Sequence, residues 1–110
     1  MNRLSPLIVI AALGFSHYAQ SQANVIAGLG ATSCARWIES RALKDEGVDN
    51  FLAAWVQGFL SGVNSRSTYR YTIPGEPRLL ASIDKYCQEN PEDPVYAASM
   101  SLYGEMSKQQ

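Results

Sequence analysis

Histidine is almost absent from this sequence of 110 residues, and its absence excludes much chemistry. The one histidine, His17, lies in an N-terminal segment that we expect to be removed. The rest of the chain then has no Ser-His or Cys-His nucleophile pair and no imidazole general base. The acidic residues show neither a calcium-loop spacing nor a pair expected to face inward together. We therefore expect no catalytic residues and no enzymatic activity.

Cysteine is also scarce, because the chain has only Cys34 and Cys87. If these two residues pair with each other, no soft ligand remains for zinc or copper. We therefore expect no metal site and no cofactor.

Charged residues are few and nearly balanced, with nine basic and ten acidic side chains. The lysines are Lys44, Lys85 and Lys108. Arginine and tyrosine alternate at Tyr69-Arg70-Tyr71, but a stacking platform for nucleic acid needs a larger basic surface. Nucleic acid is therefore not an expected partner.

The apolar run at the N-terminus, residues 7–15, is too short to span a bilayer comfortably. Arg3 precedes this run and the small residues of positions 21–23 follow it, which is the order of a signal peptide. We predict a signal peptide over residues 1–23, and a mature domain, residues 24–110, that is exported to the periplasm and does not associate with the membrane. The alternative is a buried N-terminal helix.

Export would place both cysteines where thiols oxidise. A bridge from Cys34 to Cys87 closes a loop of about 53 residues and would stabilise the fold by roughly 4 kcal/mol in the chain-entropy model. Such a staple matters in a small domain, which buries a modest fraction of its surface. We predict this disulfide; the alternative is two buried free thiols.

Apolar spacing and capping residues predict four helices. Residues 24–32 are expected to form a loosely held arm without a function, and residues 65–75 an ordered loop, with a short strand as the alternative. The predicted fold is all-α, a small orthogonal four-helix domain stapled by one disulfide. The expected helices are residues 33–43 with Ser33 as N-cap, a helix from Asp49 or Asn50 to residues 60–63, a helix from Pro77 to residues 89–90, and a helix from Pro94 with Asp93 as N-cap.

The second expected helix is the most apolar part of the mature chain and has apolar residues on nearly all its faces. This pattern is typical of a helix at the centre of a bundle or at an oligomer interface. Ala54, Gly58 and Gly62 recur every four residues and form a stripe where another helix could approach closely. A glycine inside a helix costs about 1 kcal/mol relative to alanine, so a packing gain is expected there. Alternatively, Gly62 is the C-cap of the helix.

Four features in a fixed order carry a resemblance to a known family. They are Cys34-x2-Trp37, Trp55-x2-Gly58-Phe59-x-Ser61-Gly62-x-Asn64, Tyr86-Cys87-x2-Asn90-Pro91, and a final alanine-containing helix. Together they resemble the HdeA/HdeB family of exported acid-stress chaperones, which have a helical mature domain near this size and one disulfide. The Tyr-Cys-x-x-Asn-Pro segment is the most specific part, and the resemblance covers nearly all of the mature chain.

The resemblance implies a homodimer at neutral pH that opens in strong acid and binds unfolding periplasmic client proteins without ATP. Phe51, Trp55 and Phe59 would supply the dimer and client surface, although Trp37 and Trp55 also lie on expected apolar helix faces and fit a core. Without histidine, the charge switch has to come from carboxylates near pH 4 and below. The mature chain has eight basic and ten acidic side chains, so full protonation of the acids changes its net charge from −2 to about +8.

A second, weaker resemblance is carried by the tryptophan and glycine residues of the second expected helix. It is to small periplasmic immunity proteins that neutralise secreted cell-wall amidases. This resemblance implies a protein that binds and inhibits one enzyme, with the loop at residues 65–75 as the contact. Those proteins carry further cysteines, which this chain lacks.

Overall fold

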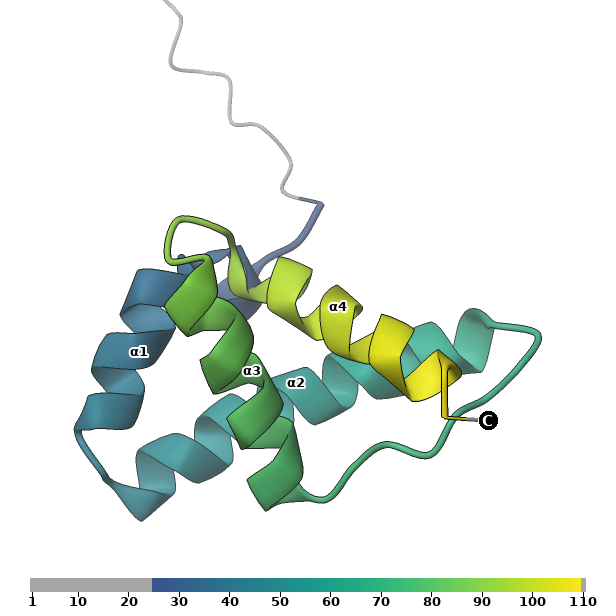
Figure 1. Ribbon diagram of the computed structural model, residues 1–110, viewed down its shortest axis with the longest axis horizontal. Helices are drawn as coiled ribbons and strands as arrows, with labels where there is room; N and C mark the ends of the chain where they lie inside the picture. Colours follow the sequence, from purple (N-terminus) through teal and green to yellow (C-terminus); the bar gives the residue numbers. More distant parts are fainter. Residues whose placement is uncertain (1–24, 110) are drawn as a thin grey trace, which may run out of the picture.

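The computed structural model describes residues 25–109, and this part of the chain is helical (Figure 1). The expected signal peptide, residues 1–23, lies outside the described residues. A short 3-10 helix precedes four α-helices, and residues 25–109 contain no β-strand. The elements are η2 (Gly28–Ala31), α1 (Cys34–Ala42), α2 (Glu46–Arg66), α3 (Glu76–Glu89) and α4 (Val95–Ser107). The prediction of a small all-α domain with four helices is confirmed.

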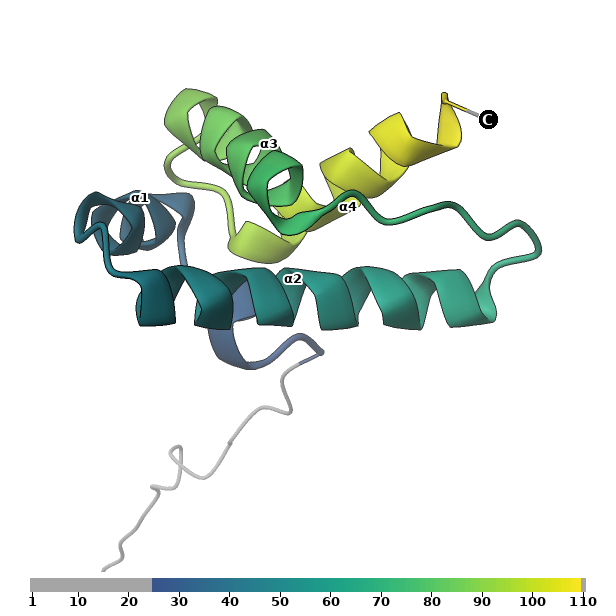
Figure 2. The ribbon, with the colours of Figure 1, turned by 90° about the horizontal axis from the view of Figure 1, so that it is seen from below.

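The longest helix, α2, runs along one side of the molecule, with α1, α3 and α4 packed on the other (Figure 2). The segment that contains η2 passes beside α2 and contacts both α2 and α4. None of the helices in residues 25–109 is long and apolar enough to cross a membrane.

The core lies between α2 and the other three helices. Its largest fully buried side chain is Trp37, and burial of a Leu-sized side chain contributes about 1.5–3 kcal/mol. Each of the four helices contributes to the core, whose buried apolar residues are Cys34, Trp37, Leu52, Ala53, Val56, Leu60, Leu79, Leu80, Ile83, Cys87, Val95, Ala98, Leu102 and Met106.

The predicted disulfide is confirmed. Cys34 and Cys87 are bonded, their Cα atoms are 4.7 Å apart, and both side chains are fully buried. The bridge joins the first residue of α1 to the last turn of α3. The alternative of two free thiols is therefore wrong.

Three helix starts differ from the prediction, and the third helix begins at Glu76, one residue before the expected Pro77. The second helix begins at Glu46, because the side chain of Asp45 accepts the Val48 N–H at 3.0 Å and caps it. The fourth helix begins at Val95 with Pro94 as N-cap, because the expected cap, Asp93, is bonded elsewhere. Capping residues close together in the sequence compete for the same role, and tertiary contacts decide between them.

The second helix also continues to Arg66, so Gly62 is not its C-cap. Residues 67–75 then form a loop, and the strand considered for this segment does not form. Asn64 holds the loop in place, since its amide donates to the Tyr71 carbonyl at 2.8 Å and accepts the Tyr71 N–H at 3.0 Å. The predicted N-cap at Ser33 and the proline in the first turn of α3 are both confirmed.

Candidate functional site

A polar junction centred on Asp84 links three of the helices. Asp84, on α3, accepts the indole N–H of Trp37 at 2.7 Å. It also accepts from Arg41, through Nε at 3.0 Å and Nη2 at 2.9 Å. Trp37 and Arg41 are four residues apart on α1, so they share one helix face and reach the same carboxylate. We call Trp37, Arg41, Asp49 and Asp84 the Asp84 junction.

Arg41 extends this junction to α2 through Asp49. Its Nη1 atom lies 2.8 Å from Asp49 Oδ1. That oxygen is buried, and the ion pair with Arg41 is its polar contact within the described residues. The contact is an ion pair that offsets the burial of this carboxylate oxygen. A single guanidinium thus lies between carboxylates from two helices.

The electrostatics of Arg41 follow from these contacts. The hydrogen bond to Asp84 raises the pKa of the guanidinium above its ordinary value; burial opposes this rise, and Asp49 adds to it. Arginine is charged at any pH that the protein meets. The guanidinium therefore keeps its charge in acid.

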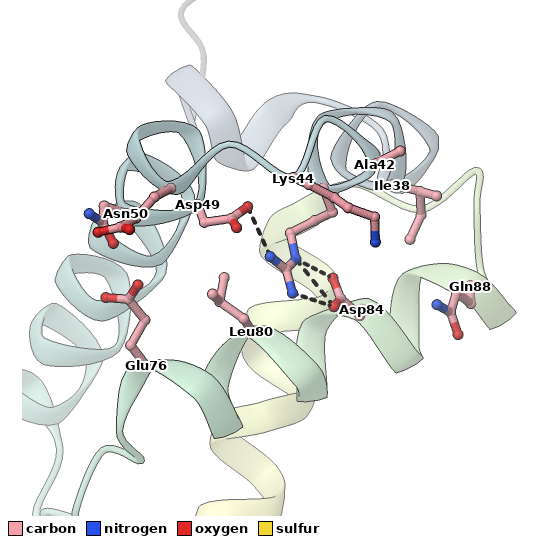
Figure 3. Close-up of a pocket in the computed structure, with 11 residues that line it drawn as sticks. Ile38, Ala42, Lys44, Asp49, Asn50, Glu76, Leu80, Asp84 and Gln88 are labelled. Atoms are coloured by element: carbon pink, nitrogen blue, oxygen red, sulfur yellow. Dashed lines mark hydrogen bonds and ion pairs between the residues drawn. The ribbon is translucent and has the colours of Figure 1, made fainter.

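The junction forms one wall of an open cleft of about 610 Å³ between α1, the start of α2, and α3. Figure 3 shows Asp49 and Asp84 on either side of the dashed contacts made by the arginine. Acidic groups outnumber basic ones in the lining, with Glu46 and Glu76 added to the two aspartates and Lys44 added to Arg41. No group of three or more potential metal ligands occurs within residues 25–109.

A second carboxylate contact lies in the last turns of α3, two residues after Asp84. The Tyr86 hydroxyl donates to Asp93 Oδ2 at 2.6 Å, and this hydrogen bond raises the pKa of Tyr86. Asp93 precedes α4, so the contact joins the end of α3 to the turn that follows it. Its backbone carbonyl also accepts the Cys34 N–H at 2.7 Å, next to the disulfide.

The three aromatic residues predicted for a dimer and client surface lie in different environments on α2. Phe51 is 65% exposed. Trp55 and Phe59 are half-buried and stack on each other, with ring centroids 5.2 Å apart and planes inclined by 17°. Of the three, only Phe51 is free to meet a partner without a rearrangement.

The predicted small-residue stripe faces away from the other helices. Ala54, Gly58 and Gly62 are all exposed, and a Cβ atom at either glycine would have no neighbour within 4 Å. Within residues 25–109 no helix packs against this stripe, so its role in helix packing stays a prediction. The helix buries its opposite face, which carries Leu52, Val56 and Leu60.

The arm that precedes α1 is not loose, contrary to expectation. Gly30 is buried, and it lies so close to the Trp55 indole that a Cβ atom there would overlap ring atoms Cη2 and Cζ2. Gly28 adopts a φ of 70°, in the left-handed region that favours glycine. Nothing in the sequence indicated that this arm contacts Trp55.

None of the residues of the Asp84 junction was among the predicted site residues, and neither were Tyr86 and Asp93. The sequence places Asp84 on the expected third helix without indicating that it meets Trp37, which lies 47 residues earlier. The fold thus defines a small all-α domain closed by one disulfide, with a carboxylate-centred junction between its helices. No family model, curated protein or solved structure matches this chain.

Proposed function

We propose that this protein is a periplasmic, ATP-independent acid-stress chaperone that opens at low pH and binds unfolding proteins. The observation that carries the proposal is the Asp84 junction. It links α1, α2 and α3 through two carboxylates, which lose their charge in strong acid. A helix contact that depends on carboxylate charge is a contact that acid weakens.

Protonation of these carboxylates weakens the contacts between α1, α2 and α3. Charge-assisted hydrogen bonds are roughly twice as strong as neutral ones, so protonation of Asp84 weakens its bonds to Arg41 and Trp37. Protonation of Asp49 removes the attraction that draws α2 toward Arg41. At the same time the mature chain acquires a net positive charge of about +8, and repulsion between like charges favours expansion.

The disulfide sets a limit to this opening. It joins α1 to α3 covalently, and α2 has no such bond to either helix. In acid, α2 is therefore the helix that can move away from a tethered α1–α3 pair. Such a movement would expose the apolar face of α2, including Leu52, Val56 and Leu60, to a client protein.

Aggregation assays test this proposal. A mixture of acid-sensitive periplasmic proteins is brought to pH 2–3 with and without the protein, and light scattering is recorded. We expect suppression of aggregation in acid and none at pH 7. Circular dichroism and sedimentation between pH 7 and pH 2 should show a reversible loss of helix packing together with dissociation of a dimer. Unchanged aggregation at pH 2–3 would exclude the chaperone function.

A second candidate function is favoured by the loop at residues 67–75. The Asn64 clamp holds this loop, Tyr69 is 70% exposed, and Arg70 is exposed beside it. A held loop with an exposed tyrosine and arginine suits insertion into the cleft of one enzyme. The protein would then be a periplasmic immunity-type inhibitor of a secreted cell-wall amidase. Tight binding to such an amidase at pH 7, lost on Tyr69→Ala, would favour this function over the chaperone.

A further inference from the structure

The contact between the N-terminal arm, residues 25–31, and Trp55 has the geometry of a bound peptide. Gly30 lies flat against the indole, where any larger residue would collide with the ring. Leu29 packs at the edge of the core, and Ile26 lies half-buried beside Gly30. Apolar side chains thus flank a glycine at the point of closest approach.

The arm is held to α2 without hydrogen bonds. Among the described residues, no hydrogen bond joins residues 25–31 to α2. Ordered pairing with the rest of the domain begins at Thr32, whose carbonyl accepts the Val95 N–H at 2.9 Å. Cys34 is then fixed by the disulfide. The arm is therefore anchored at its C-terminal end and packs against α2 and α4, and no hydrogen bond within the described residues joins it to α2.

Displacement of the arm would uncover an aromatic surface. Trp55 and Phe59 stack on each other on the side of α2 that the arm contacts. Phe51, one helical turn before Trp55, is already exposed. Without the arm, these three aromatic rings would form a continuous apolar strip along α2. Large aromatic side chains contribute most of the binding energy at many protein interfaces.

We propose that the Trp55–Phe59 surface is a binding site for short peptide segments that form a single helical turn, as η2 does, and in which apolar residues flank a glycine or another small residue, and that the arm occupies this site in the resting protein. The arm itself shows the chemistry of the ligand that fits. This inference rests on the proposed function and deepens it, because it assigns the client-binding surface and the segment that blocks it. A tethered arm competes at an effective concentration on the order of millimolar, so the resting protein excludes weak ligands.

Substitutions that dislodge the arm test this proposal in the full chain. Gly30→Ala adds a methyl group where the indole lies, so the arm and Trp55 have to separate. Ile26→Ser removes an apolar contact of the arm without adding bulk. Gly104→Ala is the matched control, because this glycine also lies in the folded domain but a Cβ there meets nothing within 4 Å.

The probe is a fluorescently labelled synthetic peptide with the sequence of residues 25–32, titrated with each protein at pH 7 and followed by anisotropy. We expect Gly30→Ala and Ile26→Ser to bind the peptide at least tenfold more tightly than the unmodified protein, because a competing arm lowers apparent affinity in proportion to its occupancy. Gly104→Ala should bind like the unmodified protein. Addition of Trp55→Ala to Gly30→Ala should abolish the gain.

Equal peptide affinity of the unmodified protein and both arm variants would overturn the proposal, as would a gain that survives Trp55→Ala. Circular dichroism establishes which variants are folded, and Ile26→Ser carries the test if Gly30→Ala is not. The proposed function is measured separately, by aggregation at pH 2–3. Suppression in acid without a gain in peptide binding refutes the arm site alone. A gain in peptide binding without suppression in acid supports the site and refutes the chaperone function.

Discussion

Replacement of Asp84 by asparagine is the most direct perturbation of the junction. The substitution keeps the size of the side chain and one acceptor oxygen for the Trp37 N–H. It removes the negative charge and the paired oxygens that Arg41 contacts through Nε and Nη2. Asp49 then remains as the only carboxylate paired with Arg41. We expect Asp84→Asn to destabilise the protein at neutral pH.

The expected size of the effect follows from the exposure of the pair. Hydrogen bonds to charged groups contribute about 1.5–3 kcal/mol, whereas fully exposed ion pairs contribute about 0–1 kcal/mol. The side chains of Arg41 and Asp84 are 26% and 22% exposed, which places this pair between the two limits. We therefore expect Asp84→Asn to lower the free energy of unfolding by about 2 kcal/mol at pH 7.

The pH dependence supplies the sharper test. The raised pKa of Arg41 corresponds to stability that is present below the pKa of arginine in the unfolded chain, so the guanidinium itself loses nothing in acid. The contribution of a charged carboxylate, in contrast, is present at neutral pH and disappears as the carboxylate is protonated. The difference between the unmodified protein and Asp84→Asn should therefore be smaller in acid than at pH 7.

Urea denaturation at pH 7 and pH 2.5, followed by circular dichroism, measures both quantities. With a slope of about 1 kcal/mol per molar urea for a small domain, the midpoint at pH 7 should fall by about 2 M. Glu92→Gln is the control, because Glu92 is exposed and forms no ion pair within the described residues. We expect it to change stability by less than about 0.5 kcal/mol. Equal free energies of unfolding for the two variants at pH 7 would refute the stabilising role of Asp84. A loss caused by Asp84→Asn that is undiminished in acid would refute its dependence on charge.

Three other predictions concern the stability of the fold. Tyr86→Phe removes the hydrogen bond to Asp93, and we expect the free energy of unfolding measured with urea to fall by about 1 kcal/mol. An ultraviolet titration of the variant should lack the one tyrosine that ionises above the ordinary range. The raised pKa of Tyr86 means that this stability is present below the ordinary tyrosine pKa and is lost as the pH rises through the folded value. Gly62→Ala should raise the free energy of unfolding by up to about 1 kcal/mol, and with it the urea midpoint, because the new methyl group meets no neighbour. A lowered midpoint together with loss of a dimer in sedimentation would instead indicate that a partner binds this face of α2. Replacement of Cys34 and Cys87 by serine should cost roughly 4 kcal/mol and lower the thermal midpoint, whereas unchanged thermal unfolding would contradict a stapling role.

The sequence by itself determined the parts of this protein that depend on local pattern. Helical spacing of apolar residues is local, and it predicted four helices. Ser33 marked the start of α1 correctly, and Pro77 marked the start of α3 to within one residue. The disulfide was predictable because a chain with two cysteines allows only one intrachain pairing. The start of α2 was misplaced because Asp45 and Asp49 are both suitable caps, and only the position of Arg41 shows that Asp49 serves another role.

The tertiary structure alone decided which distant side chains meet. Asp84 reaches Trp37 across 47 residues of sequence, and Gly30 rests on Trp55. Both contacts depend on how the helices cross and on which face each helix buries, and apolar spacing does not specify these angles. The glycines of α2 also show that spacing does not specify which face of a helix is buried. Their spacing suggested a helix contact, but α1, α3 and α4 pack on the other face of α2 and leave these glycines facing outward. Local periodicity thus specifies the elements, and the burial of one face of α2 against three other helices specifies the sites.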